Sequence, residues 1–363
     1  MITNKFQDKI VLITGHTGFK GSWLSMWLSM LGAKVYGVSD MVLTSPSHFV
    51  YIKPYLEKDI RLDITASKEI KELINDIQPD YVFHLAAQSL VNRSYSEPVR
   101  TWNTNLMGTI NILEGLNCLR NDCFAVLITS DKCYENLEWF WGYRETDKLG
   151  GSDPYSASKA ATEIAINSYI KSYFSSNSKV RIASARAGNV IGGGDWSDNR
   201  LMPDCIKAWS EGKSVILRKP ESTRPWQHVL EPLGGYIKLA KILSENLSLH
   251  GQSFNFGPNL NQNYTVLDVV TEMSKHWNNI KYEISETVEE NFKESNLLKL
   301  NCDKALYLLN WSSSLNFYET IRFTSTWYKQ FYEDPVNIFQ TTKTQINEYS
   351  ELLLKNNIFD END

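Results

Sequence analysis

The stretch KIVLITGHTGFKGSWLSMWLSML, residues 9–31, decides the fold of this chain. Its first six residues, Lys9 to Thr14, form a short β-branched and apolar run that is typical of a buried strand, and Ser22 to Leu31 reads as a helix. Glycines at positions 15, 18 and 21 lie between the two. Strand, glycine loop and helix in this order are typical of a dinucleotide-binding unit.

Each glycine of the loop has a physical task in such a unit. Gly15 allows a tight turn, Gly18 lets the backbone approach a pyrophosphate, and Gly21 lets the helix pack close to the strand. The free N–H groups and positive dipole end of the helix then face the phosphates. An ordinary glycine turn is the alternative, which the flanking strand and helix disfavour. The segment supplies the candidate cofactor-binding residues Gly15, Thr17, Gly18, Phe19, Lys20 and Gly21.

Strands and helices continue to alternate along the chain. Further strands are predicted at residues 34–38, 61–64, 81–85, 124–128 and 180–186, with helices at 67–77, 103–116 and 154–172. Repeated βα units predict an α/β fold with a Rossmann-type, doubly wound parallel sheet.

The ends of the strands offer more cofactor contacts. Asp40 follows the second strand, where a carboxylate can accept hydrogen bonds from an adenosine ribose, and no arginine is there for a 2′-phosphate. This favours NAD over NADP, although Asp40 could equally be a solvated loop residue. The other candidate NAD-binding residues are Asp63, Ile64, Leu85, Ala86, Ala87, Ser89, Thr104, Thr129, Tyr155 and Lys159.

After Arg186 the regular alternation stops. Residues 187–196 read as a long flexible loop, and short helices and scattered strands follow. We therefore expect a Rossmann domain over 1–187, rejoined by about 229–258, and a smaller, interleaved substrate domain formed by 188–228 and 259–363. The last residues, 359–363, are expected to be frayed.

Composition narrows the class of partner. The 363 residues carry a net charge of -5 without a basic run, so no nucleic-acid or anionic membrane surface is indicated. Five cysteines without a CxxC pair and six scattered histidines predict neither a disulfide framework nor a metal site. No apolar run reaches the length of a membrane span, and we expect a cytoplasmic protein.

Two short segments carry groups that can move protons. Ser130, Asp131 and Lys132 follow the strand that ends at residue 128. Tyr155 and Lys159 are four residues apart on one helix face, where the lysine charge would favour the tyrosinate by lowering the pKa of the tyrosine from its usual value of about 10. As isolated patterns both segments could be surface groups. Their place after a strand and at a helix start favours catalysis.

Together with the glycine loop and His84 to Ala87, these residues resemble the extended short-chain dehydrogenase/reductase family. The resemblance covers about residues 8–330. It implies NAD and a nucleotide sugar as ligands, with Ser130, Tyr155 and Lys159 oxidising the sugar at C4. Asp131-Lys132 resembles the acid/base pair of the nucleotide-hexose 4,6-dehydratases within that family, which implies Asp131 as the acid at C6 and Lys132 as the base at C5.

Several longer strings resemble the branch of these dehydratases that acts on CDP-glucose. They are GHTGFKGSW (15–23), DKCYEN (131–136), WGYRE (141–145), ARAGNVIGGGDW (185–196) and RPWQHV (224–229). Lysine at position 132, where most other 4,6-dehydratases have glutamate, agrees with this branch. A lysine is a poor base unless burial or nearby cations lower its pKa, and Asp131 must carry a proton to act as an acid. One proton shared between the two as a coupled unit would meet both needs.

The substrate side is less sharply defined by the pattern. Arg218 and Arg224 are candidates for the diphosphate, because a guanidinium fork fits phosphate oxygens. The resemblance adds contacts to the nucleotide sugar, and the candidates together are Asn189, Arg200, Leu201, Met202, Arg218, Arg224 and Asn255. Relatives pair through the helix that carries Tyr155 and the one before it, which implies a homodimer or homotetramer.

Three alternatives stay open from the sequence. One is a 4,6-dehydratase for another nucleotide sugar, and the second, disfavoured by Asp131 and Lys132, is a sugar epimerase. The third is a non-catalytic NAD-binding protein of the same fold, which the intact Tyr155 and Lys159 disfavour.

Overall fold

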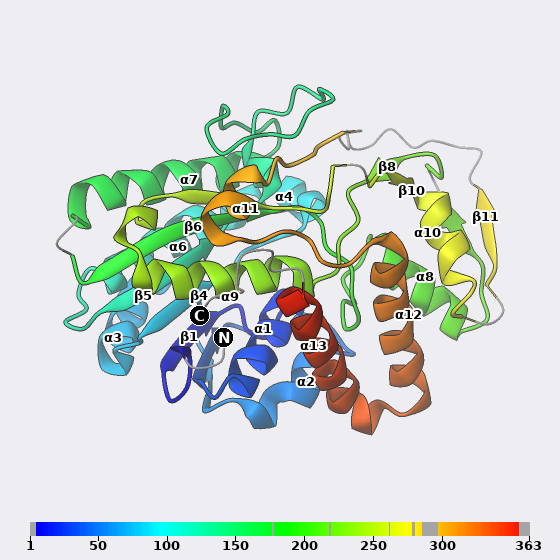
Figure 1. Ribbon diagram of the computed structural model, residues 1–363, viewed down its shortest axis with the longest axis horizontal. Helices are drawn as coiled ribbons and strands as arrows, with labels where there is room; N and C mark the ends of the chain where they lie inside the picture. Colours follow the sequence, from blue (N-terminus) through cyan, green and yellow to red (C-terminus); the bar gives the residue numbers. More distant parts are fainter. Residues whose placement is uncertain are drawn as a thin grey trace.

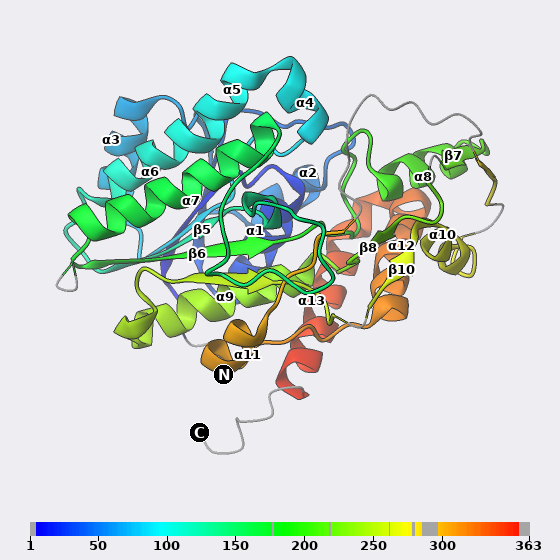
Figure 2. The same ribbon diagram turned by 90° about the horizontal axis from the view of Figure 1, so that it is seen from above.

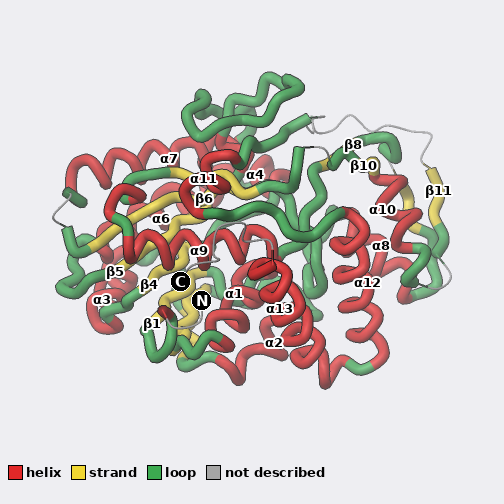
Figure 3. Tube along the Cα trace, viewed as in Figure 1, coloured by secondary structure: helices red, strands yellow, loops and turns green. Residues whose placement is uncertain are grey.

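A single parallel sheet of seven strands runs through the chain in the computed structural model, which describes residues 5–175, 178–217, 219–260, 262–277, 280–284 and 297–355. The strand order is β3-β2-β1-β4-β5-β6-β9, the doubly wound order with one added edge strand. The strands are β1 (Ile10–Thr14), β2 (Lys34–Ser39), β3 (Lys58–Arg61), β4 (Tyr81–His84), β5 (Cys123–Ile128), β6 (Val180–Ala187) and β9 (Ser253–Phe256). Figure 1 shows them lying between the helices, and Figure 3 shows the strands in yellow enclosed by helices in red.

The two faces of the sheet are covered by different helices (Figure 2). Because side chains alternate along a strand, Val11 and Ile13 enter one apolar core and Leu12 enters the other. The core around Leu12 is completed by α3 (Ser67–Ile77), α6 (Gly108–Leu116) and α7 (Pro154–Tyr173). The core around Val11 and Ile13 is completed by α1 (Phe19–Met30), α9 (Leu230–Glu245) and α13 (Ile338–Lys355).

A smaller region lies beyond the carboxyl ends of the strands, at the right of Figure 1. Its helices are α8 (Leu201–Ser210), α10 (Val266–Met273) and α12 (Phe317–Glu333). Its strands form two pairs, antiparallel β8 (Thr223–Arg224) with β10 (Tyr264–Thr265), and parallel β7 (Val215–Leu217) with β11 (Tyr282–Ile284). Capping boxes at Thr265/Asp268 and Asn316/Glu319 begin α10 and α12.

The remaining elements are short connections around the sheet. They are α2 (His48–Ile52), a 3₁₀ turn Lys53–Tyr55, α4 (Val91–Ser96), α5 (Pro98–Trp102), a π-helical turn Asn103–Met107, a 3₁₀ turn Asp131–Cys133, a 3₁₀ turn Leu247–Leu249, α11 (Asp303–Leu309) and a 3₁₀ turn Pro335–Asn337. None of the helices in the described part of the chain could cross a bilayer, because each is too short or too polar.

The predicted fold class is confirmed. Helix α9 packs on β5 and β6, and β9 is an edge strand of the main sheet. Two details differ from the prediction. Residues 187–196 are largely buried, with Trp196 packed against Trp327 and Phe331, so this loop is a packed segment and the prediction of a flexible one is wrong. The last helix, α13, which the sequence assigns to the substrate domain, packs against α12 and also against α1, α2 and α9. The predicted frayed end, 359–363, lies outside the described residues.

Candidate active site

The glycine loop between β1 and α1 has the shape that a dinucleotide requires. Gly15 has φ +74°, and a Cβ there would lie 2.7 Å from the Ala86 nitrogen. A Cβ on Gly21 would lie 2.1 Å from the Gly15 carbonyl oxygen. Helix α1 begins at Phe19 without a side-chain cap and without an acidic residue in its first turn, so its N–H groups can receive phosphate oxygens. These residues fit a bound NAD.

The other residues predicted to bind NAD lie mostly at the carboxyl ends of β1 to β4. Asp40 is exposed just after β2, and Asp63 and Ser89 are exposed after β3 and β4. Thr17 is buried and donates its hydroxyl to the Met41 carbonyl at 2.7 Å. Partly buried Leu85, Ala86 and Ala87 follow β4, and Thr104 is in the π-helical turn. Ile64 is buried in the apolar core around Leu12.

Two of these predicted NAD-binding residues have neighbours that sequence reasoning did not foresee. Thr129 is buried, and its hydroxyl donates to Glu163. Lys20 lies where its charge interacts with Arg200, Asp131 and Lys159; burial, followed by Arg200, lowers its pKa to about 8. The charge of Lys20, in the glycine loop, therefore interacts with the charges of the catalytic residues Asp131 and Lys159.

The segment after β5 places three predicted catalytic residues in one tight turn. Ser130 caps the 3₁₀ turn by accepting the Lys132 N–H at 3.2 Å, and its hydroxyl donates to Asp131 Oδ1 at 3.0 Å. Asp131 is only 6% exposed. Burial raises the pKa of its carboxyl group, even though the Lys132 charge and the Ser130 hydrogen bond act in the opposite direction. The shift favours the protonated acid.

Tyr155 and Lys159 lie in the first two turns of α7 and are both buried. Asp153 caps this helix by accepting the Ser156 N–H at 2.9 Å, which fixes where the turns begin. Burial lowers the pKa of Lys159 to about 8, although Glu163 acts to raise it. Burial also raises the pKa of Tyr155 to about 12, with a hydrogen bond from Ser130 acting to lower it. The sequence predicts a lowered pKa for Tyr155, and this direction is wrong because desolvation outweighs Ser130 and the Arg200 charge, which act to lower the pKa.

A pocket opens directly at the Asp131–Lys132 turn. Two of the predicted substrate residues, Asn189 and Arg224, line it. Lys299 is on its wall as well, from a segment that the sequence did not single out. The full lining is Asp131, Lys132, Asn189, Thr223, Arg224, Pro225, Asn263, Leu297, Leu298 and Lys299.

Three other predicted substrate residues that the structure describes do not line this pocket. Arg200 forms an ion pair with Asp195 at 3.0 Å, and Met202 is in the apolar core. Leu201 is partly buried at the start of α8. Arg218 lies outside the described residues.

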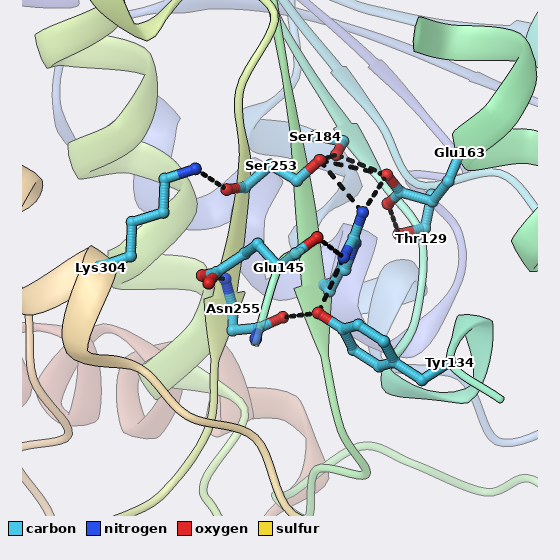
Figure 4. A network of polar contacts seen from close by, with 9 residues as sticks. Thr129, Tyr134, Glu145, Glu163, Ser184, Ser253, Asn255 and Lys304 are labelled. Carbon is cyan, nitrogen blue, oxygen red and sulfur yellow. Dashed lines mark hydrogen bonds and ion pairs between the residues drawn. The ribbon is translucent and has the colours of Figure 1, made fainter. Parts of the chain in front are cut away.

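Asn255 also lies away from the pocket, for a different reason. Its side chain is fully buried, and its amide group donates to the carbonyls of Tyr143 and Asn301 while accepting from the Tyr134 hydroxyl. The structure thus places Asn255 in a protein network instead of the pocket (Figure 4).

Sequence reasoning missed that network, which centres on an ion pair between Glu163 and Arg186 at 2.8 Å. One signal was available, because Glu163 follows Lys159 by four residues and so shares its helix face. Arg186, Ser184 and Ser253 carry no such signal, since parallel strands bring them together only in the folded sheet. Lys299 likewise reaches the pocket only through the tertiary fold.

Known proteins with similar sequences include nucleotide-sugar dehydratases and epimerases. The sequence pattern of the family described as GDP-mannose 4,6 dehydratase matches residues 12–324. The chain is 41% identical to a CDP-glucose 4,6-dehydratase of Salmonella typhimurium over 352 residues, which cover 95% of this chain and 97% of that protein. It is 23% identical to a UDP-glucose 4-epimerase of Mycoplasma genitalium, over 89% of this chain and 97% of that one.

Solved structures share the fold. An epimerase of Methanothermobacter thermautotrophicus superposes with a TM-score of 0.77 at 21% identity, covering 92% of this chain and 96% of that one. A UDP-glucuronic acid 4-epimerase of Bacillus cereus, solved with UDP-glucuronic acid and NAD, gives a TM-score of 0.74 at 20% identity, covering 89% of this chain and 99% of that one.

Proposed function

We propose that this chain, which belongs to the GDP-mannose 4,6 dehydratase family, is an NAD-dependent CDP-glucose 4,6-dehydratase. The product would be CDP-4-keto-6-deoxyglucose, a precursor for deoxysugars of surface polysaccharides such as lipopolysaccharide O-antigen. One observation carries the proposal: a buried Asp131 and the adjoining Lys132 follow Ser130 in one turn and line a pocket. A 4-epimerase needs no acid/base pair at C5 and C6, whereas a 4,6-dehydratase does.

NAD, bound at the glycine loop, supplies the oxidant that accepts the C4 hydride and later returns it to C6. Gly15, Gly18 and Gly21 would hold its phosphates with the N–H groups of the first turn of α1. Asp40, exposed at the end of β2, would accept the hydrogen bonds of its adenosine ribose. The buried ammonium of Lys159 would orient the second ribose.

Tyr155 serves as the base for the oxidation. It takes the proton of the C4 hydroxyl as the C4–H bond breaks, which leaves a ketone at C4. Burial raises its pKa to about 12, which disfavours the tyrosinate at neutral pH, so Tyr155 depends on the Lys159 charge one helical turn away to ionise when the sugar is bound. Ser130 would assist by turning its hydroxyl from Asp131 to the Tyr155 oxygen, where a donated hydrogen bond favours the ionised form.

Asp131 and Lys132 carry out the elimination. The C4 ketone acidifies the C5 hydrogen, which Lys132 removes as a proton. Asp131, whose pKa burial raises, gives its proton to the C6 hydroxyl, so that the C6–O bond breaks and water leaves. When C6 has been reduced, Lys132 returns a proton to C5. Once the proton that Tyr155 took from the C4 hydroxyl has passed through solvent to Asp131, both groups are restored and the sum of the steps is the loss of one water.

The cations at the pocket suit a nucleoside diphosphate. Arg224 and Lys299 both line it, and Asn189 is exposed beside the Asp131–Lys132 turn. A guanidinium and an ammonium on one wall would neutralise the two negative charges of a diphosphate, with the sugar then directed toward Asp131 and Lys132.

A panel of nucleotide hexoses tests the function. The protein would be incubated with CDP-glucose, UDP-glucose, dTDP-glucose and GDP-mannose in the presence of NAD, and each product weighed by mass spectrometry. We expect loss of one water from CDP-glucose alone. Loss from a different nucleotide sugar would move the activity to that substrate, and no loss from any would overturn the dehydratase assignment.

We also propose that two or four copies assemble through α7 and the helical segment before it. Helices α5 and α7 adjoin, and apolar side chains on both point to solvent, with Val99 71% exposed and Ile164 61% exposed. Light scattering should give the mass of a dimer or tetramer. Val99→Glu combined with Ile164→Glu should shift it to the monomer, whereas Val336→Glu, at a comparably exposed site elsewhere, should not.

A further inference from the structure

The buried ion pair Glu163–Arg186 lies between α7 and the segment around the Asp131–Lys132 turn. Figure 4 shows Glu163 beside Thr129 and Ser184. Glu163 follows Lys159 by one helical turn and Tyr155 by two, on the face of α7 that is buried. Its carboxylate accepts hydrogen bonds from Arg186 at 2.8 Å, from the hydroxyl of Ser184 at 3.0 Å, and from that of Thr129. Burial acts to raise the pKa of Glu163, but Arg186 and these hydrogen bonds outweigh it, so the pKa is lowered and the group is ionised.

Arg186 continues the network on the far side of the catalytic turn. Its Nη1 donates to the Tyr134 hydroxyl at 2.8 Å and to the Glu145 carbonyl at 3.0 Å. The guanidinium also lies over the Tyr134 ring, 5.0 Å from its centre. The Tyr134 hydroxyl donates onward to Asn255 Oδ1 at 2.8 Å.

Ser130, Asp131 and Lys132 therefore lie between two anchors to the same ion pair. Thr129, immediately before them, is bonded to Glu163, and Tyr134, just after the turn, is bonded to Arg186. Glu163 is carried by the helix that bears Tyr155 and Lys159. The ion pair thus spans the acid/base pair of the elimination and the pair that performs the oxidation.

We infer that Glu163, Arg186 and Tyr134 are positioning residues that hold the Asp131–Lys132 turn in register with Tyr155 and Lys159, so that oxidation and elimination act on one bound sugar. This inference rests on the proposed function. A buried ion pair is weak evidence for a role in folding stability, because well-packed apolar residues in its place often give equal or greater stability. A misplacement of about 1 Å can lower a rate about a hundredfold, so position is where such a pair acts on catalysis.

Tyr134→Phe tests the inference with a mild change. It removes one hydroxyl, and with it the bonds to Arg186 and Asn255, and keeps the ring beneath the guanidinium. Tyr143→Phe is a matched control: its ring stacks on Tyr134 at 5.2 Å and is 2% exposed, but its hydroxyl bonds to Leu137 and Asn136. Thr129→Val removes the second anchor in the same way.

Single-turnover measurements with CDP-glucose separate the two reactions. The appearance of reduced nicotinamide absorbance reports oxidation, and its decay reports completion of elimination. In Tyr134→Phe we expect the decay to slow at least about tenfold while the appearance changes less than about threefold. In Thr129→Val, at a candidate NAD contact, we expect the decay to slow at least about tenfold relative to the appearance. In Tyr143→Phe both rates should stay within about threefold. Equal effects of Tyr134→Phe and Tyr143→Phe, or a parallel fall of both rates, would overturn the inference.

Amide hydrogen exchange on the free protein keeps this test separate from the proposed function. Protection of the amides of Lys132, Cys133 and Tyr134, which close the turn, should fall at least about tenfold in Tyr134→Phe and not in Tyr143→Phe. Unchanged protection would contradict the positioning role even if the wild type acts on no nucleotide sugar. Wild-type protein that fails to release water would overturn only the proposed function.

Discussion

A carboxyl group must be protonated at neutral pH if Asp131 is to protonate a leaving hydroxyl, and burial favours that state. From sequence, the neighbouring Lys132 would be expected to lower the pKa of Asp131. In the folded chain Asp131 is enclosed by the turn that Ser130 caps, and desolvation outweighs the lysine charge. Within the Asp131–Lys132 pair, burial therefore favours the protonated, neutral form of the Asp131 carboxyl group.

Lys132→Ala should keep the fold and abolish dehydration. Lys132 is only partly buried and only its backbone N–H bonds to Ser130, so alanine preserves the turn. Loss of the base at C5 should slow the release of water at least about a hundredfold, which is the lower end of the rate enhancement that a general base contributes. Mass spectrometry of the product with CDP-glucose would measure this.

Lys148→Ala is the control for Lys132→Ala, because that lysine is exposed and pairs with Glu135 on the surface. Its turnover should match the wild type. Normal water release by the Lys132→Ala protein would remove Lys132 from the mechanism.

At the scale of elements, α1 packs so close to the glycine loop that position 21 has no room for a side chain. A Cβ on Gly21 would lie 2.1 Å from the Gly15 carbonyl, so α1 could not keep its distance from the loop. Gly21→Ala should therefore weaken NAD binding at least about tenfold, equivalent to about 1.4 kcal/mol. Calorimetric titration with NAD would measure it.

Gly257→Ala, a glycine-to-alanine change far from α1 in the sequence, is the control for Gly21→Ala. There a Cβ would meet its nearest neighbour, Leu300 Cβ, at 3.4 Å, an ordinary contact. NAD affinity should be unchanged in that variant. Equal affinity of the Gly21→Ala protein and the wild type would show that the loop does not hold the cofactor.

For the whole molecule, buried histidines should govern stability in acid. His48, His84 and His228 are buried, and burial lowers the pKa of each to about 3. They stay neutral in the folded chain, while the unfolded chain binds protons to them below about pH 6.5. Stability is therefore lost as pH falls from about 6.5 toward 3. Glu231, with a pKa raised to about 7, acts oppositely between about pH 7 and 4.5.

Urea unfolding at a series of pH values would measure this loss. Each proton taken up on unfolding changes the free energy of unfolding by about 1.4 kcal/mol per pH unit. His84→Asn should reduce the slope near pH 4 by about one proton, because His84 bonds through both ring nitrogens to Thr14 and Thr109 and has no access to water. An unchanged slope would contradict the assignment.

The sequence by itself determined the features that depend on short range. Strand, glycine loop and helix in residues 9–31 specify the parallel βα order, and Tyr155 and Lys159 share a face because four residues make about one helical turn. Ser130 to Lys132 needed only the end of β5. Spacing along one element is enough to place such groups.

Only the tertiary structure decided the features that join distant segments. Lys299 lines the pocket, and Asn255 bonds to Tyr134 in the Arg186 network. Helix α13 packs against α1 and α9 as well as α12. Each of these contacts joins residues that are far apart in the sequence, so it forms only when the chain folds. The pKa directions of Asp131 and Tyr155 belong here as well. Desolvation depends on every element that covers a group, and that cover exists only once the chain is folded.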